Sequence, residues 1–144
     1  MKIDALRVIL AGVAGTALMT VVGLYVAPLM GMPPMNPAVM LAGAVGGNLA
    51  LGWTAHFTIG IVLAAGYALV GSALPGPLAL RGAVYGLAPF LAAQIVVMPL
   101  MGMPVFSGSA AMAAGSLVGH LVYGAVIGAV YGRGWESVQI PATA

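Results

Sequence analysis

Residues 116–131, SLVGHLVYGAVIGAVY, contain the most specific pattern of this chain, and the pattern occurs twice. The earlier copy is residues 52–67, GWTAHFTIGIVLAAGY, in which His56 lies 64 positions before His120. In both copies a small residue follows the histidine after four and eight positions, and a tyrosine follows after eleven. On an α-helix these offsets share one face. The pattern therefore predicts two related helices that each present a histidine, small residues and a tyrosine.

The composition predicts an integral membrane protein. Of the 144 residues, 62% are hydrophobic and 4% are charged, and the mean hydropathy is +1.15. A soluble domain of this size would need more charged residues to keep its surface hydrated. Four basic and two acidic residues form no basic patch, so nucleic acid is excluded as a partner. We expect membrane lipids and other transmembrane helices as the partners.

The residue types also argue against an enzyme. The chain has no cysteine, which excludes disulfides, thiolate nucleophiles and thiolate metal sites. Its acidic residues, Asp4 and Glu136, lie far apart near the two ends, so no catalytic carboxylate pair is expected. The sequence contains no GxSxG motif, P-loop or dinucleotide fingerprint.

Four apolar stretches, each long enough to cross a hydrocarbon core of about 30 Å, predict an all-α fold of four transmembrane helices. A cleaved signal peptide is the competing interpretation of the first stretch, but its apolar run is too long for a signal h-region. Gly46 and Gly47 predict a break before the second helix. We expect helices at about residues 6–30, 47–74, 80–101 and 109–131, a surface segment at 38–45, and an extended or frayed tail after 131.

The hexapeptide PLMGMP occurs at residues 28–33 and again at 99–104, in each case before the histidine pattern. Two shared motifs in the same order indicate an internal duplication, of about residues 8–72 and 80–132. Each half crosses the membrane an even number of times. The halves are therefore predicted to be parallel helical-hairpin repeats related by a pseudo-twofold axis along the membrane normal.

The distribution of basic residues predicts the orientation. All of them lie near the termini or in the middle loop, whereas the Met–Pro turns, residues 28–37 and 99–104, carry no charge. By the positive-inside rule both termini face the cytoplasm and the Met–Pro turns face outside. The basic residues are Lys2, Arg7, Arg81 and Arg133.

Small residues follow one face of the second and the fourth helix. In lipid, such faces let backbones approach closely and drive helix association. They predict packing of these two helices on each other, or of either on another subunit; chance spacing of glycine in an alanine-rich chain is the alternative. The residues are Gly52, Gly60, Ala64, Ser116, Gly124, Gly128 and Gly132.

His56 and His120 are expected near the middle of their spans, where an ionised side chain is costly, so both are predicted to be neutral. Three hypotheses remain open. The imidazoles could hydrogen-bond across a helix interface, ligate a haem b between facing helices, or share a metal ion or a proton. Tyr67 and Tyr131 lie three turns later and are expected to be anchors at the membrane interface.

Methionines gather in the two Met–Pro turns. Thioethers suit Cu(I), so Met30, Met32, Met101 and Met103 could form an external copper site. The alternative is that methionine fills space flexibly and that the duplication copied one turn twice.

At the PLMGMP turns and the stretch GSLVGHLVYGAVIGAVYG, the chain resembles a family of small bacterial four-helix membrane proteins of unknown function, distantly similar to YagU-type inner-membrane proteins. The resemblance spans most of residues 8–132. It implies a multi-pass protein of the bacterial inner membrane, and it supplies no catalytic residue.

From these features we expect a non-enzymatic accessory or structural subunit that packs through its glycine faces in a homo-oligomer or a larger membrane complex. One alternative is a haem- or metal-binding bundle for electron transfer that uses His56 and His120. Another is a small transporter.

Overall fold

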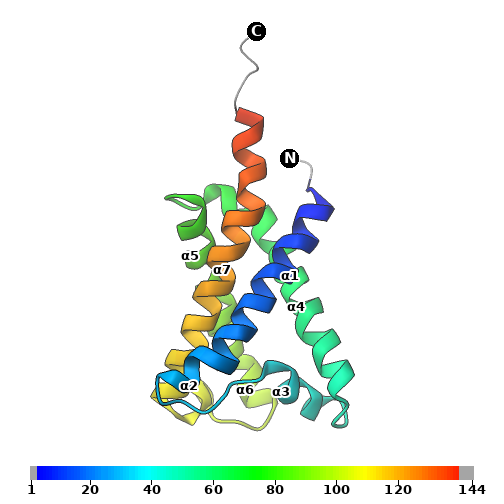
Figure 1. The fold of residues 1–144 in the computed structure, drawn as a ribbon, viewed down its shortest axis with the longest axis vertical. Helices are drawn as coiled ribbons and strands as arrows, with labels where there is room; N and C mark the ends of the chain where they lie inside the picture. Colours follow the sequence, from blue (N-terminus) through cyan, green and yellow to red (C-terminus); the bar gives the residue numbers. More distant parts are fainter. Residues whose placement is uncertain (1–2, 140–144) are drawn as a thin grey trace.

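The computed structural model describes residues 3–139, and the side chains of residues 3–134. Within this part of the chain, four helices are long and apolar enough to cross a membrane, which confirms the predicted all-α membrane fold. The start of the first spanning helix and the end of the last lie at the same end of the bundle (Figure 1). The four spans are Ala5–Leu29, Leu49–Ala73, Leu78–Leu100 and Ala110–Gly134.

The first span contains a π-turn just before its proline. Pro28 has no N–H, and its ring would collide with the carbonyl four residues earlier in a regular α-helix. The π-turn widens the helix there, and the N–H of Ala27 donates to the carbonyl of Val22, five residues back. The elements of this span are α1 (Ala5–Val21), the π-turn η1 (Val22–Val26) and α2 (Ala27–Leu29).

The third span repeats this construction before Pro99. The N–H of Met98 donates to the carbonyl of Ala93, again five residues back. Pro89 lies inside the α-helical part of this span, and the π-turn begins after it, at residue 93. The elements are α5 (Leu78–Ala92), the π-turn η3 (Ala93–Val97) and α6 (Met98–Leu100).

The two Met–Pro turns also have the same backbone. Gly31 and Gly102 adopt φ of 80° and 76°, a left-handed conformation that glycine tolerates best. The N–H of the following methionine returns to the carbonyl at the start of the short helix, over 3.2 Å in the first half and 3.0 Å in the second. The repeated hexapeptide therefore adopts the same turn in both halves of the chain.

The first turn continues into α3 (Pro37–Ala44), a short helix that packs on the second span. Gly46 and Gly47 then adopt φ of 72° and 81°, which breaks the helix. Asn48 caps the next helix by accepting the N–H of Leu51 over 3.1 Å. The second span consists of α4 (Leu49–Val70) and the 3₁₀ turn η2 (Gly71–Ala73).

The last span begins after η4 (Val105–Gly108), in which Phe106 and Ser107 have positive φ. The helix α7 (Ala110–Gln139) continues well past residue 131. The predicted extended or frayed tail after residue 131 is therefore wrong for residues 132–139, where the helix continues without a break. Lys2 and the side chain of Glu136 lie outside the part of the chain that the structure describes.

Helix packing differs from the prediction. α7 packs chiefly on α5 and α1, and α4 packs on α1 and α3, whereas α4 and α7 touch at few positions. The closest seam joins α5 and α7, where a Cβ on Gly82 would collide with the carbonyl oxygen of Gly124. The predicted pairing of the two histidine helices is wrong because Gly60 of α4 packs on α1, whereas Gly124 and Gly128 of α7 pack on α5.

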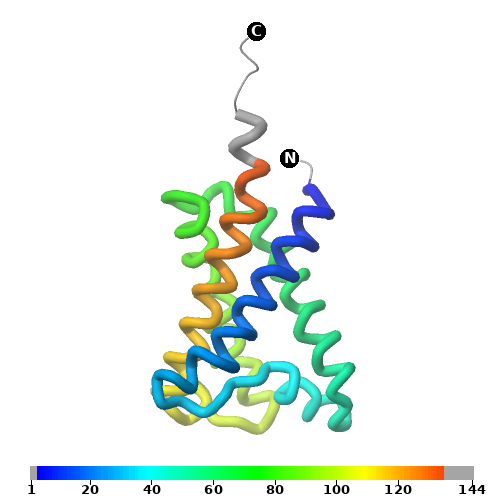
Figure 2. The backbone as a smooth tube through the Cα atoms, in the orientation of Figure 1, coloured from blue at the N-terminus to red at the C-terminus, as the bar shows by residue number. Residues whose placement is uncertain are grey.

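The pseudo-twofold relation is incomplete. An exact twofold would match the α1–α7 interface with an equivalent α5–α4 interface, but α4 and α5 share few contacts. α4 instead diverges from α5 and α7 toward the end of the bundle that carries α2, α3 and α6 (Figures 1 and 2). The helices enclose a cavity toward that end.

At the other end the bundle is filled by a tyrosine layer: Tyr67, Tyr85, Tyr123 and Tyr131. Tyr67 is fully buried and Tyr131 is 4% exposed, so the prediction that they anchor at the membrane interface is wrong. They face the bundle because they share the helix face of the glycines. The hydroxyls of Tyr85 and Tyr123 donate to α4 carbonyls, those of Leu63 (2.8 Å) and Gly60 (2.6 Å).

We predict that Gly124→Leu lowers the free energy of unfolding by about 1–3 kcal/mol, because the new side chain forces α5 and α7 apart. Gly43→Leu on α3 is the matched control, since no atom lies within 4 Å of a Cβ built at Gly43. Thermal unfolding in detergent, followed by circular dichroism, measures both. Equal stability of the two variants would contradict the α5–α7 seam.

Candidate functional site

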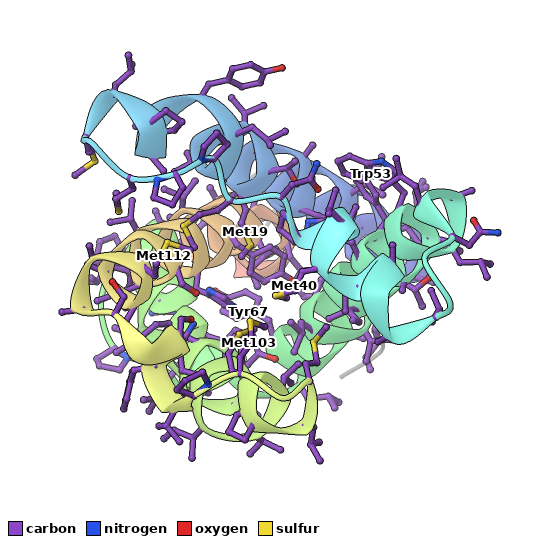
Figure 3. The ribbon with its side chains drawn as sticks, turned by 90° about the horizontal axis from the view of Figure 1, so that it is seen from below. Met19, Met40, Trp53, Tyr67, Met103 and Met112 are labelled. Carbon is purple, nitrogen blue, oxygen red and sulfur yellow. The ribbon has the colours of Figure 1, made fainter. Side chains whose placement is uncertain are left out.

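Between the tyrosine layer and the Met–Pro turns, the helices enclose a cavity of about 530 Å³. Figure 3 looks into it from the Met–Pro end, with Met19, Met40 and Met103 around the opening and Tyr67 beyond them. Most of the lining is aliphatic or thioether. The polar lining residues are Thr16, Asn36, His56, Gln94, Ser107, Ser116, His120 and Tyr123. This combination of apolar walls and few polar groups is typical of small-molecule sites.

Hydrogen bonds to α1 fix the tautomer of His56. The hydroxyl of Thr20 donates to the carbonyl of Thr16 over 2.7 Å, which uses its only hydrogen. The Thr20 oxygen therefore accepts the bond that links it to Nε2 of His56 at 3.0 Å. The neutral ring then carries its proton on Nε2, and Nδ1 keeps its lone pair.

His120 has the opposite tautomer. Its Nδ1 lies 2.8 Å from the carbonyl oxygen of Ser116, which can only accept, so Nδ1 carries the proton. Phe90 packs with its ring at a steep angle against the imidazole, at a centroid distance of 5.8 Å. Nε2 keeps its lone pair. Within the described residues, neither this nitrogen nor Nδ1 of His56 has a hydrogen-bond partner.

A polar chain connects the loop before α7 to the His120 turn. The hydroxyl of Ser107 donates to Oε1 of Gln94 over 3.0 Å, and Nε2 of Gln94 donates to the hydroxyl of Ser116 over 3.0 Å. Gln94 lies in the π-turn η3 and is 1% exposed. It therefore holds the left-handed loop, η3 and α7 together around one wall of the cavity.

Thr16 contributes an unsatisfied group. Its hydroxyl oxygen is buried and has no hydrogen-bond partner among the described residues. Thr16 lines the cavity and packs against Gly60, where a Cβ would collide with the hydroxyl oxygen. A buried hydroxyl without a partner is uncommon in native structures.

Methionine sulfur is concentrated along the cavity. The Sδ atoms of Met32 and Met35 each lie 2.9 Å from the position that a Cβ of Gly115 would occupy. Met30 is 64% exposed, so the two turns do not direct all four predicted methionines to one point. The methionines that line the cavity are Met19, Met35, Met40, Met98, Met103 and Met112.

The predicted small residues lie in three different seams. Gly52 meets α3, Gly60 meets α1, and the glycines of α7 meet α5, where a Cβ on Gly128 would collide with the carbonyl oxygen of Leu78. Gly132 lies beside the Leu78 side chain, Ala64 is in the core next to the tyrosine layer, and Ser116 belongs to the polar chain.

The sequence analysis missed Thr20 and the bridging role of Gln94. Thr16 and Thr20 are spaced four apart on one helix face, a signal that polar groups share that face. Gln94 is the one amide inside the third span, so its burial in a polar network is the ordinary expectation. Within the described residues there is no group of three or more histidines or acids that could hold a metal ion.

Comparison with known proteins gives a family without a function. A family model described as a family of unknown function (DUF6789) matches residues 3–140. No curated protein and no solved structure matches the chain. The match agrees with the predicted likeness to proteins of unknown function, whereas the likeness to YagU-type proteins stays a prediction.

We predict that Thr20→Val redistributes the ring proton of His56 toward Nδ1, because Nε2–H loses its acceptor, while His120 keeps its Nδ1–H tautomer. Ring ¹⁵N chemical shifts of histidine-labelled protein measure this directly, since the chain has two histidines. The matched control is Thr54→Val on the exposed side of α4, where the hydroxyl donates only to the carbonyl of Ala50. An unchanged His56 spectrum in Thr20→Val would contradict the assigned tautomer.

Proposed function

This chain belongs to the family of unknown function DUF6789, and from its geometry we propose that it is a non-enzymatic, multi-pass membrane protein that binds a small ligand in the cavity between its helices. Four apolar helices make it a small membrane protein. The ligand-binding role is the inference that its interior supports best.

The observation that carries this proposal is the set of unpaired polar atoms around one cavity. Nδ1 of His56 and Nε2 of His120, on two residues that line the cavity, have no hydrogen-bond partner among the described residues. Polar ring atoms inside an apolar membrane span normally find a hydrogen-bond partner. A bound ligand would supply the missing partners.

Access from one side supports binding and release at a single membrane face. The tyrosine layer closes one end of the cavity, and the Met–Pro turns surround the other. Arg7, Arg81 and Arg133 all lie toward the closed end, as the helix bounds require. Under the positive-inside rule the cavity then opens outward and the termini are cytoplasmic. A transport cycle would have to open the tyrosine layer.

The predicted role as an accessory or structural subunit loses its main support. The glycine faces that could receive a partner helix are covered by helices of the same chain. The residues left on the outside are chiefly large aliphatic side chains, which suit lipid tails. A partner would therefore have to pack on an aliphatic surface rather than in a glycine groove.

A haem b ligated by both histidines fits poorly. Nε2 of His56 is engaged by Thr20, and α4 and α7 do not pack face to face. The described arginines lie at the end opposite the cavity mouth, so no cation is placed to pair with the propionates. We therefore favour a smaller ligand.

We predict that Ala93→Cys, on the cavity wall, reacts with a small membrane-impermeant thiosulfonate added outside sealed vesicles, whereas Ala64→Cys, beside the tyrosine layer, does not. The natural chain has no cysteine, so each variant has a single thiol. Labelling is measured by mass spectrometry. Full labelling of denatured Ala64→Cys is the control, and an unreactive Ala93→Cys would refute an open cavity.

A further inference from the structure

The two histidines offer lone pairs, not protons, to whatever enters the cavity. The tautomers derived above leave Nδ1 of His56 and Nε2 of His120 without hydrogen. A ligand that presents only acceptor atoms, such as a carboxylate or a quinone carbonyl, could not hydrogen-bond to these nitrogens. Its lone pairs would be repelled by those of the two imidazoles. The complementary ligand is an electron-pair acceptor or a strong hydrogen-bond donor.

The other lone pairs in the cavity are those of sulfur. Met19 and Met35 line the cavity and lie beside α7, at Gly119 and Gly115. Gly115 has no side chain, and the sulfur atoms of Met32 and Met35 lie beside its Cα. The Cγ and Cε atoms of Met19, which flank its sulfur, lie beside Gly119 in the same way. Glycine at these two positions of α7 leaves room for thioethers where another residue would place its own side chain.

The absence of charged side chains from the cavity lining narrows the choice of ligand further. The residues that line the cavity include no Asp, Glu, Lys or Arg. Hard divalent cations such as Mg²⁺ and Ca²⁺ prefer oxygen ligands, chiefly carboxylates, and the cavity lining provides no carboxylate. Thioether and neutral imidazole ligands favour Cu(I), which as a monovalent ion also needs less compensating charge in an apolar interior.

We propose that the cavity is a Cu(I) site in which Nδ1 of His56 and Nε2 of His120 supply the nitrogen ligands and the sulfurs of Met19 and Met35 supply the soft ligands. This proposal rests on the ligand-binding function proposed above. Ser116 and Thr20 act as positioning residues, because their bonds to the opposite ring nitrogens fix the imidazole tautomers.

The test uses the full chain in detergent micelles, labelled with ¹³C at the methionine methyl groups and titrated with Ag(I), a redox-inert probe of Cu(I) sites. We expect saturation near one equivalent, with shifts of the Met19 and Met35 methyl signals and none for the exposed Met30. Cu(I) itself is then measured anaerobically against a colorimetric chelator. Met19→Leu with Met35→Leu should weaken binding by more than about tenfold.

Met30→Leu is the matched control and should leave the affinity unchanged, because it removes a thioether outside the cavity. Leucine nearly conserves the volume of methionine, so the double variant should fold, and circular dichroism checks this. His120→Gln should also weaken Ag(I) binding and abolish the shift of the remaining histidine ring nitrogen on titration.

Uniform shifts of all methionine methyl signals without saturation would overturn the copper site. So would tighter binding of Zn(II) than of Ag(I), or a copurified organic molecule that Ag(I) does not displace. If Ala93→Cys is labelled from outside but Ag(I) does not bind, the cavity function stands and the identity of the ligand is wrong. If Ala93→Cys is unreactive, the cavity function itself fails.

Discussion

Backbone contact through glycine is the constraint on which the rest of this structure depends. In lipid, apolar side chains gain little by leaving the solvent, so helices associate where their backbones can approach closely. Gly82 with Gly124 joins α5 to α7, and Gly12 with Gly60 joins α1 to α4. No comparable seam joins α4 to α5, where a tyrosine hydroxyl reaches across instead. The cavity is the space that this unequal distribution of seams leaves open.

The fold was largely predictable because its signals are local. Hydropathy over a span length identifies the four helices, and Gly46, Gly47 and the repeated PLMGMP identify the breaks. The pairing of helices was not predictable in the same way. A stripe of small residues identifies the helix face that packs, but it does not identify the helix on which that face packs. The glycines of α7 were expected to pack on α4, and they pack on α5 instead. The burial of Tyr67 was not predicted for a related reason. A tyrosine near the end of a transmembrane span has the same sequence pattern whether it faces lipid or the bundle interior.

The candidate site was predicted in part. His56 and His120 could be recognised as exceptional because a polar ring within an apolar span requires a partner. Those partners could not be identified from the sequence, since Thr20 lies 36 positions from His56 and only the tertiary packing brings them together. The tautomer of each histidine depends on which atom of its partner accepts the ring N–H. The sequence gives even less information about this than about the identity of the partner. The methionines of the turns were noticed, but the cavity draws most of its thioethers from other elements.

Pro28 links the backbone to the cavity wall. In a π-turn, the residue at position 28 would donate its N–H to the carbonyl of Gly23, five residues earlier, but proline has no N–H. The Gly23 carbonyl instead accepts the N–H of Met35 over 2.9 Å. The residue that interrupts the helix thus docks the following loop, and with it a methionine that faces the cavity. A non-proline residue at position 28 would supply an N–H that, in the π-turn pattern, competes with Met35 for the Gly23 carbonyl. The shape of this helix and the position of one cavity-lining methionine are therefore coupled through a single carbonyl.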